Sequence, residues 1–237
     1  PQLNKNDNEI LSYCIRNHAE IANLKVTELA DRLFISPASV VRFCQKLGFS
    51  GYSDFKASLR MDLFEPEAAP RETRPTDFFR DIQKTIQMVP EETVERIVEL
   101  IHRSRRIELY AVGSSRMPGT ELAKRLQTIG KAAFCYDDST LMNISARQLT
   151  PDDLVLALSI SGETSLIIAA ATVAKSRGAA LVSFTNLGSN TLSSMADETL
   201  YVNATNFVRS GIQVQSRVQL LMLCEYLFFR YIETYGG

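Results

Sequence analysis

The chain has 237 residues, 45% of them hydrophobic, and a formal net charge of -1 at pH 7. This length suits one large domain or two smaller ones, and the composition is ample for globular cores. A near-neutral charge excludes an overall basic protein, so any contact with nucleic acid has to come from a local patch. No signal-peptide pattern opens the sequence, and its longest apolar run is far shorter than a membrane span. We therefore expect a cytoplasmic protein with no membrane partner.

The four cysteines are widely separated and form no C-x-x-C pair. The sequence therefore predicts neither a zinc site nor a disulfide framework, and it predicts no cofactor. Each cysteine has apolar neighbours, which is typical of a small core residue. The four are Cys14, Cys44, Cys135 and Cys224.

Residues 1–64 are predicted to form a compact helical unit. Apolar residues at helical spacing follow two capping candidates, Asn6 and Asp7, and the same spacing recurs in a short second helix over residues 26–33. The apolar face of the first helix consists of Ile10, Leu11, Cys14 and Ile15.

A third helix is predicted after a tight turn at residues 34–35. Ser36 offers an N-cap, and Pro37 suits the first helical position, where its missing N–H costs nothing. One side of this helix is apolar and the other is polar and basic, as a helix-turn-helix requires in order to reach base edges and phosphates. A solvated surface helix has a polar face too, and on charge alone that simpler interpretation is favoured.

Residues 32–60 carry five basic side chains and one acidic one, a local excess of four positive charges. The run Lys-Leu-Gly-Phe-Ser-Gly-Tyr-Ser-Asp-Phe-Lys, residues 46–56, resembles the end of the DNA-binding domain of RpiR-type transcription regulators. That family joins a helix-turn-helix to a C-terminal sugar isomerase (SIS) domain. The residues predicted to contact DNA are Ser36, Ser39, Arg42, Gln45, Lys46 and Lys56.

Residues 65–75 contain three Pro, three Glu and two Arg, a composition that marks an exposed linker. An amphipathic helix is predicted over residues 78–89, and another begins at Pro90, with acidic residues at the positive end of its dipole. We place the second domain at residues 76–237.

Strands and helices alternate through the second domain. This alternation predicts a doubly wound parallel sheet of five strands, and therefore an α/β domain joined to an all-α N-terminal domain. The ends of three strands, near Gly113, Ser159 and Thr185, should converge on one rim. The strands are predicted over residues 107–112, 133–136, 154–158, 180–184 and 199–202.

The stretch from Leu154 to Thr164 carries the clearest functional pattern. Its first five residues are apolar without alternation, which suits a strand buried on both faces. Ser159, Ser161 and Thr164 then present three hydroxyls within six positions, and Gly162 lets a ligand approach the backbone. Hydroxyls and free N–H groups at a helix N-terminus make a ready anion site, although Ser and Thr also cap helices routinely.

Ser-x-Ser-Gly-Glu-Thr, residues 159–164, resembles the signature loop of SIS domains, which bind phosphosugars. Val-Gly-Ser-Ser, residues 112–115, resembles the other phosphate-facing loop of that family, and the likeness covers roughly residues 91–237. The resemblance implies phosphate contacts from Ser115, Ser159, Ser161 and Thr164. The whole implied ligand-binding set is Ser114, Ser115, Arg116, Ser159, Ser161, Gly162, Glu163 and Thr164.

Arg116 departs from the family pattern, in which a small residue is expected. Its guanidinium would pair with phosphate bidentately, or point into solvent or toward a partner subunit. Asp137 and Asp138 end another strand and would either meet sugar hydroxyls or cap the helix that begins at Ser139.

The last helix is predicted over residues 212–235 and is apolar around much of its circumference. One face should pack on the sheet, and a partner subunit should cover the other, giving a homodimer or homotetramer. Leu227 and Phe228 are candidates for that outer face.

Two functions remain open. The first, which we favour, is a DNA-binding transcription regulator controlled by a phosphorylated sugar, with no catalytic residue. The alternative is a SIS-fold sugar-phosphate isomerase with a structural helical N-terminus, which needs a base beside the sugar. The chain has two histidines, His18 and His102, and Glu163 is the first candidate base.

Overall fold

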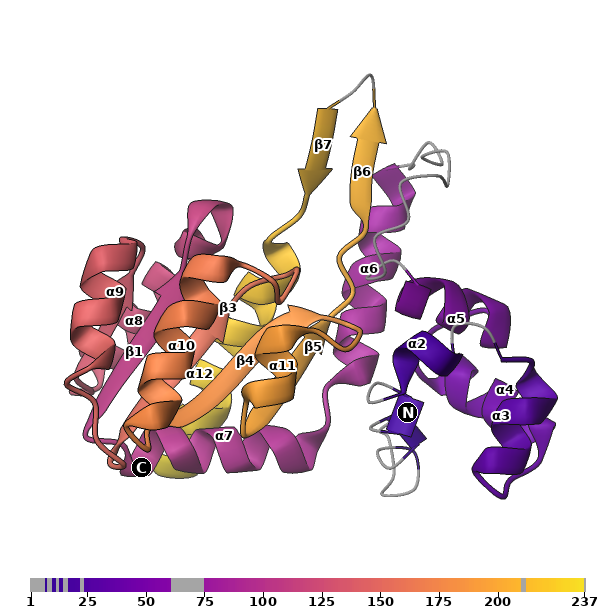
Figure 1. Ribbon diagram of the computed structural model, residues 1–237, viewed down its shortest axis with the longest axis horizontal. Coiled ribbons are helices and arrows are strands. Elements are labelled where there is room, and N and C mark those ends of the chain that lie inside the picture. Colours follow the sequence, from indigo (N-terminus) through magenta and orange to yellow (C-terminus); the bar gives the residue numbers. More distant parts are fainter. Residues whose placement is uncertain are drawn as a thin grey trace. The chain divides into compact units, whose positions relative to one another are not determined.

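The computed structural model describes residues 7, 10, 11, 13, 14, 17–21, 24–60, 75–209 and 212–236 (Figure 1). The chain divides into two compact units. The first unit consists of Pro1–Pro90, Leu187–Ser189 and Thr205–Gln215, and the second of Glu91–Asn186, Asn190–Ala204 and Ser216–Gly237.

The first unit contains the predicted helix-turn-helix as α3 and α4. Ser36 is the N-cap of α4 and its Oγ accepts a hydrogen bond from the Ser39 N–H at 3.1 Å, with Pro37 at the first helical position, as predicted. The described helices of this unit are α2 (His18–Ile21), α3 (Val26–Arg32), α4 (Pro37–Lys46), α5 (Tyr52–Arg60) and α6 (Pro75–Met88).

Some predictions for the first unit concern residues outside the described ranges. These are the capping candidate Asn6, the apolar residue Ile15 and the linker residues 65–74. Pro75, which we placed at the end of the linker, is instead the first residue of α6. Proline tolerates this position because the first N–H of a helix has no partner within the helix.

Three aromatic rings pack together in the core of the first unit. Phe55 makes edge-to-face contacts with Phe43 and Phe49, at centroid distances of 5.8 and 5.3 Å. Lys84 of α6 is buried, with Nζ 4.1 Å from the centroid of the Phe49 ring and 3.4 Å from Asp54 Oδ2. Burial acts to raise the pKa of Asp54, but the Ser50 N–H and the Lys84 charge hold that pKa below its ordinary value. Helix α6 is thus fastened to α5 and to the turn between α4 and α5.

The turn between α3 and α4 contains a residue in the left-handed region. Phe34 has φ +54°, and its side chain is 96% exposed. A residue with a Cβ pays about 1–2 kcal/mol in this conformation, which glycine avoids. Since the ring is almost wholly in water, no core packing offsets that strain.

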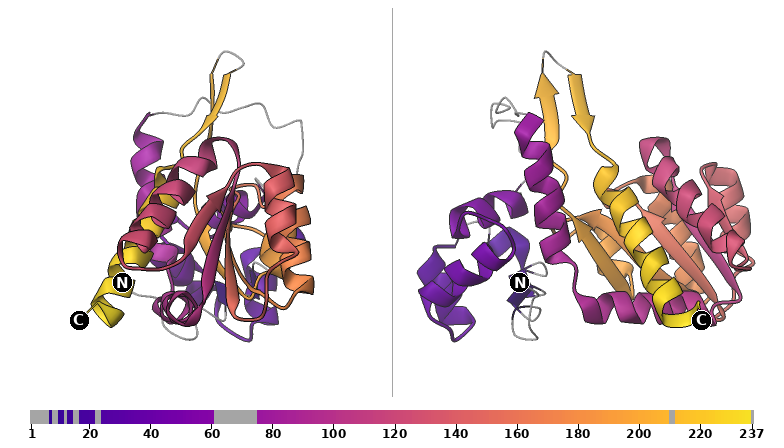
Figure 2. Two further views of the ribbon diagram at one scale, coloured as in Figure 1. Left: turned by 90° about the vertical axis from the view of Figure 1, so that its left-hand side faces the viewer. Right: turned by 180° about the vertical axis from the view of Figure 1, so that it is seen from behind.

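The second unit is a five-stranded parallel sheet in the order β2-β1-β3-β4-β5, so the predicted doubly wound fold is confirmed. Figure 2 shows α8 and α12 on one face of this sheet and α9 and α10 on the other. The elements are α7 (Glu91–Arg103), β1 (Arg106–Ala111), α8 (Arg116–Thr128), β2 (Ala133–Tyr136), α9 (Ser139–Ala146), β3 (Asp153–Leu158), α10 (Ser165–Ser176), β4 (Ala180–Asn186), α11 (Thr191–Met195), β5 (Glu198–Val202) and α12 (Val218–Tyr235).

The prediction of one helix over residues 212–235 is wrong at its beginning. Ile212–Gln215 form β7, which pairs antiparallel with β6 (Asn206–Arg209), and α12 begins only at Val218 (Figure 1). Ile212 and Val214 alternate with Gln213 and Gln215, which is the two-residue period of a strand, and their branched side chains favour extended backbone. The helix was predicted from the many apolar residues of the whole segment, and the short alternating pattern at its beginning was overlooked.

Helix α12 buries one side within its own unit. Leu227 is 0% exposed, so its assignment to an outer face is wrong. The apolar side chains that α12 does expose are Val218 (41%) and Phe229 (59%), while Phe228 is half-buried. Among the described helices, none combines the length and the apolar character needed to cross a membrane.

Candidate functional site

The strand order reverses between β1 and β3, and this reversal creates the candidate site. The two strands are neighbours, with Ala111 opposite Leu158 at their carboxyl ends. The helices that follow them, α8 and α10, lie on opposite faces of the sheet (Figure 2). The loops therefore diverge at this edge of the sheet, and such a reversal is where open parallel sheets typically bind ligands.

The first loop, Gly113–Ser115, is a single 3₁₀ turn ahead of α8. Gly113 has φ +57°, Ser114 is exposed and Ser115 is buried. The Ser115 Oγ accepts a hydrogen bond from Arg217 Nε at 3.2 Å. Arg217 was not among the predicted site residues, because nothing near it in the sequence links it to this loop.

The second loop gathers its hydroxyls around Ser159. The Ser159 Oγ lies 2.8 Å from Thr164 Oγ1 and 3.4 Å from Ser161 Oγ, and it accepts the Gly162 N–H at 3.2 Å. Thr164 occupies the N-cap position of α10, yet its side chain makes no capping hydrogen bond. Helix capping therefore does not explain this threonine, which turns instead toward the other hydroxyls.

Gly162 and Glu163 fasten this loop to the start of α11. Gly162 has φ +66°, and a Cβ at this position would overlap the side chain of Asn190, the N-cap of α11. Glu163 accepts hydrogen bonds from the Thr191 N–H at 2.6 Å and the Thr191 hydroxyl at 2.8 Å. The Leu192 N–H donates to the Gly162 carbonyl at 3.1 Å. These contacts give both residues a positioning role in the loop.

Arg116 forms an ion pair with Asp137, which was not among the contacts expected for it. Its Nη1 donates to the carboxylate of Asp137, and both side chains are exposed. The hydrogen bond raises the pKa of Arg116 and lowers the pKa of Asp137. Asp138 is the N-cap of α9 and accepts the Leu141 N–H at 2.9 Å, so for Asp138 the capping alternative is confirmed.

The candidate DNA-contacting residues differ in how they are engaged. Ser36, Arg42 and Gln45 are exposed, and Arg42 Nη2 donates to Ser39 Oγ at 3.2 Å. The two lysines bond within the first unit. Lys46 Nζ lies 2.7 Å from Asp7 Oδ2, and Lys56 Nζ donates to the Leu24 carbonyl at 3.1 Å. The exposed polar surface therefore centres on α4.

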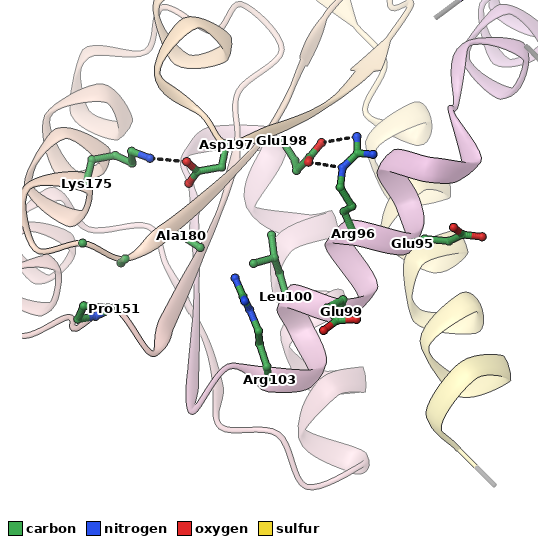
Figure 3. Close-up of a pocket in the computed structure, with 12 residues that line it drawn as sticks. Glu95, Arg96, Glu99, Leu100, Arg103, Pro151, Lys175, Ala180, Asp197 and Glu198 are labelled. Atoms are coloured by element: carbon green, nitrogen blue, oxygen red, sulfur yellow. Dashed lines mark hydrogen bonds and ion pairs between the residues drawn. The ribbon is translucent and has the colours of Figure 1, made fainter. Parts of the chain in front are cut away.

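Two of the cavities in the described part of the chain lie away from the hydroxyls of the second loop. One of about 660 Å³ is at the amino ends of the strands, where Arg96 pairs with Glu198 and Lys175 with Asp197 (Figure 3). These two ion pairs line the cavity, and the serine loops are at the other end of the strands. The second cavity, of about 590 Å³, lies between α8 and α12 and is bordered by Ser114 and Arg116.

Three comparisons with known proteins agree with this geometry. The family model of the SIS domain matches residues 100–230, and that of the helix-turn-helix domain of the rpiR family matches residues 1–66. The Vibrio vulnificus NanR protein, whose structure was solved in complex with ManNAc-6P, is 31% identical. Its match covers 99% of this chain and 88% of that one, with a TM-score of 0.62.

A similar curated protein is the HTH-type transcriptional regulator GlvR of Bacillus subtilis, 26% identical over 98% of this chain and 91% of its own length. The sugar isomerase domain of an RpiR transcription factor from Sphaerobacter thermophilus is 20% identical, with a TM-score of 0.63 over 68% of this chain and 88% of that one, and shows the shared fold. The chain belongs to the RpiR-type transcription regulators, in which a helix-turn-helix precedes a SIS domain.

We predict that Gly162→Ala lowers the free energy of unfolding by at least about 2 kcal/mol, since it adds left-handed strain to an overlap with Asn190. In an Asn190→Gly background the overlap is gone, and the same change should cost only about 1 kcal/mol. Urea unfolding of the four proteins measures this coupling. Equal costs in both backgrounds would contradict it.

Proposed function

We propose that this transcription regulator binds operator DNA through α3 and α4, and that a phosphorylated sugar at the carboxyl ends of β1 and β3 sets its operator affinity. The observation that carries the proposal is the hydroxyl cluster of Ser159, Ser161 and Thr164, which lies where the strand order reverses. Thr164 bonds within this cluster and does not cap α10. The domain limits that we propose are 1–64 for DNA binding and 76–237 for the SIS domain, with a linker at 65–75. DNA binding fits a cytoplasmic location.

The proposed site suits a phosphate dianion. Hydroxyls and backbone N–H groups supply neutral donors, and the N-termini of α8 and α10 add two positive dipole ends. Ser115, Ser159, Ser161 and Thr164 are the proposed phosphate contacts, with Ser114 and the backbone of Gly162 adjacent. For Arg116, a phosphate contact would require it to leave Asp137.

The first effector to test is ManNAc-6P, because NanR was solved with it. A bound effector at about a hundredfold over its dissociation constant should stabilise the fold by about 2.7 kcal/mol, and the unphosphorylated sugar should do little. Ser161→Ala should weaken effector binding by about 1.5–3 kcal/mol, since it removes a donor to a charged group. Ser176→Ala, at the far end of α10, is the matched control.

Thermal shift over a panel of phosphosugars measures these effects. A panel in which no phosphosugar stabilises the protein, or a Ser161→Ala variant that responds as the wild type does, would count against the proposed site.

The DNA contact is tested by selecting bound sites from random duplexes. Arg42→Ala should cost about 1–3 kcal/mol and loosen the preference at one base position, because an exposed Arg reads base edges. Lys46→Ala should instead lower the stability of the first unit and leave the salt dependence of binding unchanged, because Nζ bonds Asp7. Failure of the intact protein to enrich any sequence, with or without effector, would refute operator binding.

We propose that a second copy of the chain covers the exposed apolar side of α12 and α8. Val218, Phe229 and Met117 are 41%, 59% and 54% exposed there. Exposed apolar side chains on two helices that pack together favour an association surface, and a symmetric dimer would present two helix-turn-helix units to a two-fold operator. Tetramers would require a further surface.

Phe229→Glu should give monomers that keep their fold, because the ring contributes little to the core of its own unit. Leu141→Glu is the matched control, since Leu141 is 55% exposed on the opposite face of the sheet. Sedimentation at micromolar concentration separates the two variants. A wild-type monomer under these conditions would rule the interface out.

The alternative is a sugar-phosphate isomerase, since isomerases of this fold are among the similar structures at 15% and 17% identity. Isomerisation needs a base beside the sugar. Both carboxylate oxygens of Glu163 accept bonds from Thr191, and His102 stacks on Tyr235 near the end of α7, ahead of β1. The side chain of His18 lies outside the described residues. We therefore propose no catalytic residue, and steady conversion of a bound sugar observed by NMR would favour the isomerase.

A further inference from the structure

Arg217 brings a permanent positive charge to the first hydroxyl loop. It directly precedes α12, and its Nε donates to the Oγ of Ser115, which is 6% exposed. The Arg217 side chain is half-buried, and this burial lowers the pKa of its guanidinium, which nevertheless remains protonated. A desolvated cation beside neutral donors strengthens a site for an anion.

We propose that Arg217 binds the phosphate of the effector and ties the β6–β7 ribbon to the ligand site, so that effector binding reaches the DNA-binding unit through this ribbon. The inference rests on the proposed function and names a residue and a route that the serine loops alone do not supply.

The chemistry of the Ser115–Arg217 pair favours this role. A hydroxyl has one donor and two acceptor sites, so Ser115 can accept from Arg217 while its own O–H donates to a phosphate oxygen. The bond thereby orients the hydroxyl proton toward the ligand. A guanidinium carries its N–H donors in a planar fork whose shape matches a phosphate, and in Arg217 the Nε–H of this fork bonds Ser115.

The chain leaves the second unit for the β6–β7 ribbon, and returns from it, at residues that are bonded near strand ends. Where it leaves, the Ala204 N–H donates to Asn186 Oδ1, at the end of β4, at 2.9 Å. Where it returns, Arg217 is bonded to the loop that follows β1. Between these points, Asn206 pairs with Gln215 at the base of the ribbon. A change at Arg217 is therefore two residues along the chain from a paired strand.

The next residue after Ala204 begins the segment Thr205–Gln215 of the first unit and is fastened to α6. Thr205 donates to Asp81 of α6 twice, through its N–H at 2.8 Å and its hydroxyl at 3.0 Å, and Asp81 is 6% exposed. On the same helix, the buried Lys84 contacts Asp54 of α5 and Phe49 of the turn between α4 and α5. Each step from Arg217 to α5 is thus a covalent bond, a strand pair, a hydrogen bond or an ion pair.

A ligand shifts an equilibrium only by its difference in affinity for the two states. A phosphate that accepts hydrogen bonds from Arg217 favours one position of the α12 N-terminus and of the ribbon joined to it. Coupling between two such sites typically changes affinity 5- to 150-fold, and the same factor applies in both directions.

Binding of inorganic phosphate to the full chain, measured by titration calorimetry, tests the contact. Arg217→Gln should weaken phosphate binding at least about tenfold, as expected for the loss of a charged hydrogen-bond partner. Arg217→Lys, which keeps the charge but loses the planar fork, should give an intermediate value and guards against misfolding of the first variant. Arg103→Gln removes an exposed charge at the other end of the sheet and should bind as the wild type does.

The outcomes separate the two proposals. Loss of phosphate binding in Ser161→Ala with wild-type binding in both Arg217 variants would overturn the role of Arg217 and leave the proposed site standing. A wild-type chain that binds neither inorganic phosphate nor a phosphosugar would overturn both.

Hydrogen exchange with saturating inorganic phosphate tests the route. Phosphate should change exchange at least about twofold in the ribbon and in α6 of the wild type. Thr205→Val, which removes one bond to Asp81, should keep the phosphate affinity and the change in the ribbon but reduce the change in α6. Unaltered exchange in the ribbon and α6 of the saturated wild type would refute the route.

Discussion

The reversal of strand order between β1 and β3 is the constraint on which the rest of the site depends. Because α8 and α10 leave these neighbouring strands toward opposite faces, the two loops diverge at the edge of the sheet. Ser115 and Ser159, which are 44 positions apart, are thereby brought to adjacent strand ends. The same geometry places the N-termini of α8 and α10 at one edge of the sheet. The positions of these backbone N–H donors therefore follow from the topology and not from particular side chains.

In the proposed site, the second loop contains hydroxyls that would contact the phosphate and other residues that hold the loop in place. Ser159, Ser161 and Thr164 bond mainly to one another, an arrangement in which a phosphate can replace weak hydroxyl contacts with stronger charged ones. Gly162 and Glu163 have no such latitude, because their contacts with α11 fix the loop. The motif at residues 159–164 therefore contains residues with different structural roles.

Local patterns predicted the helix-turn-helix, the five strands and the two hydroxyl loops, because each depends on neighbours in the sequence. The failures concern partners distant in the chain. Nothing near Lys46 shows that Asp7 binds it, and nothing near Arg217 shows that it reaches Ser115. Leu227 was misplaced because composition shows that a helix is apolar, while only packing shows which side is covered. The strand at Ile212–Gln215 had a readable two-residue period, but it was short and lay beside a long apolar run.

The strained turn at Phe34 has an evolutionary consequence. A residue that stores strain and buries nothing lowers stability without any return in packing. Under drift constrained by stability alone, Gly or Asn would displace it readily, since both adopt the left-handed region at lower cost. The first unit is therefore less stable than the same backbone with Gly or Asn at position 34 would be. Replacement of Phe34 is the first change expected in a more thermostable descendant of this chain.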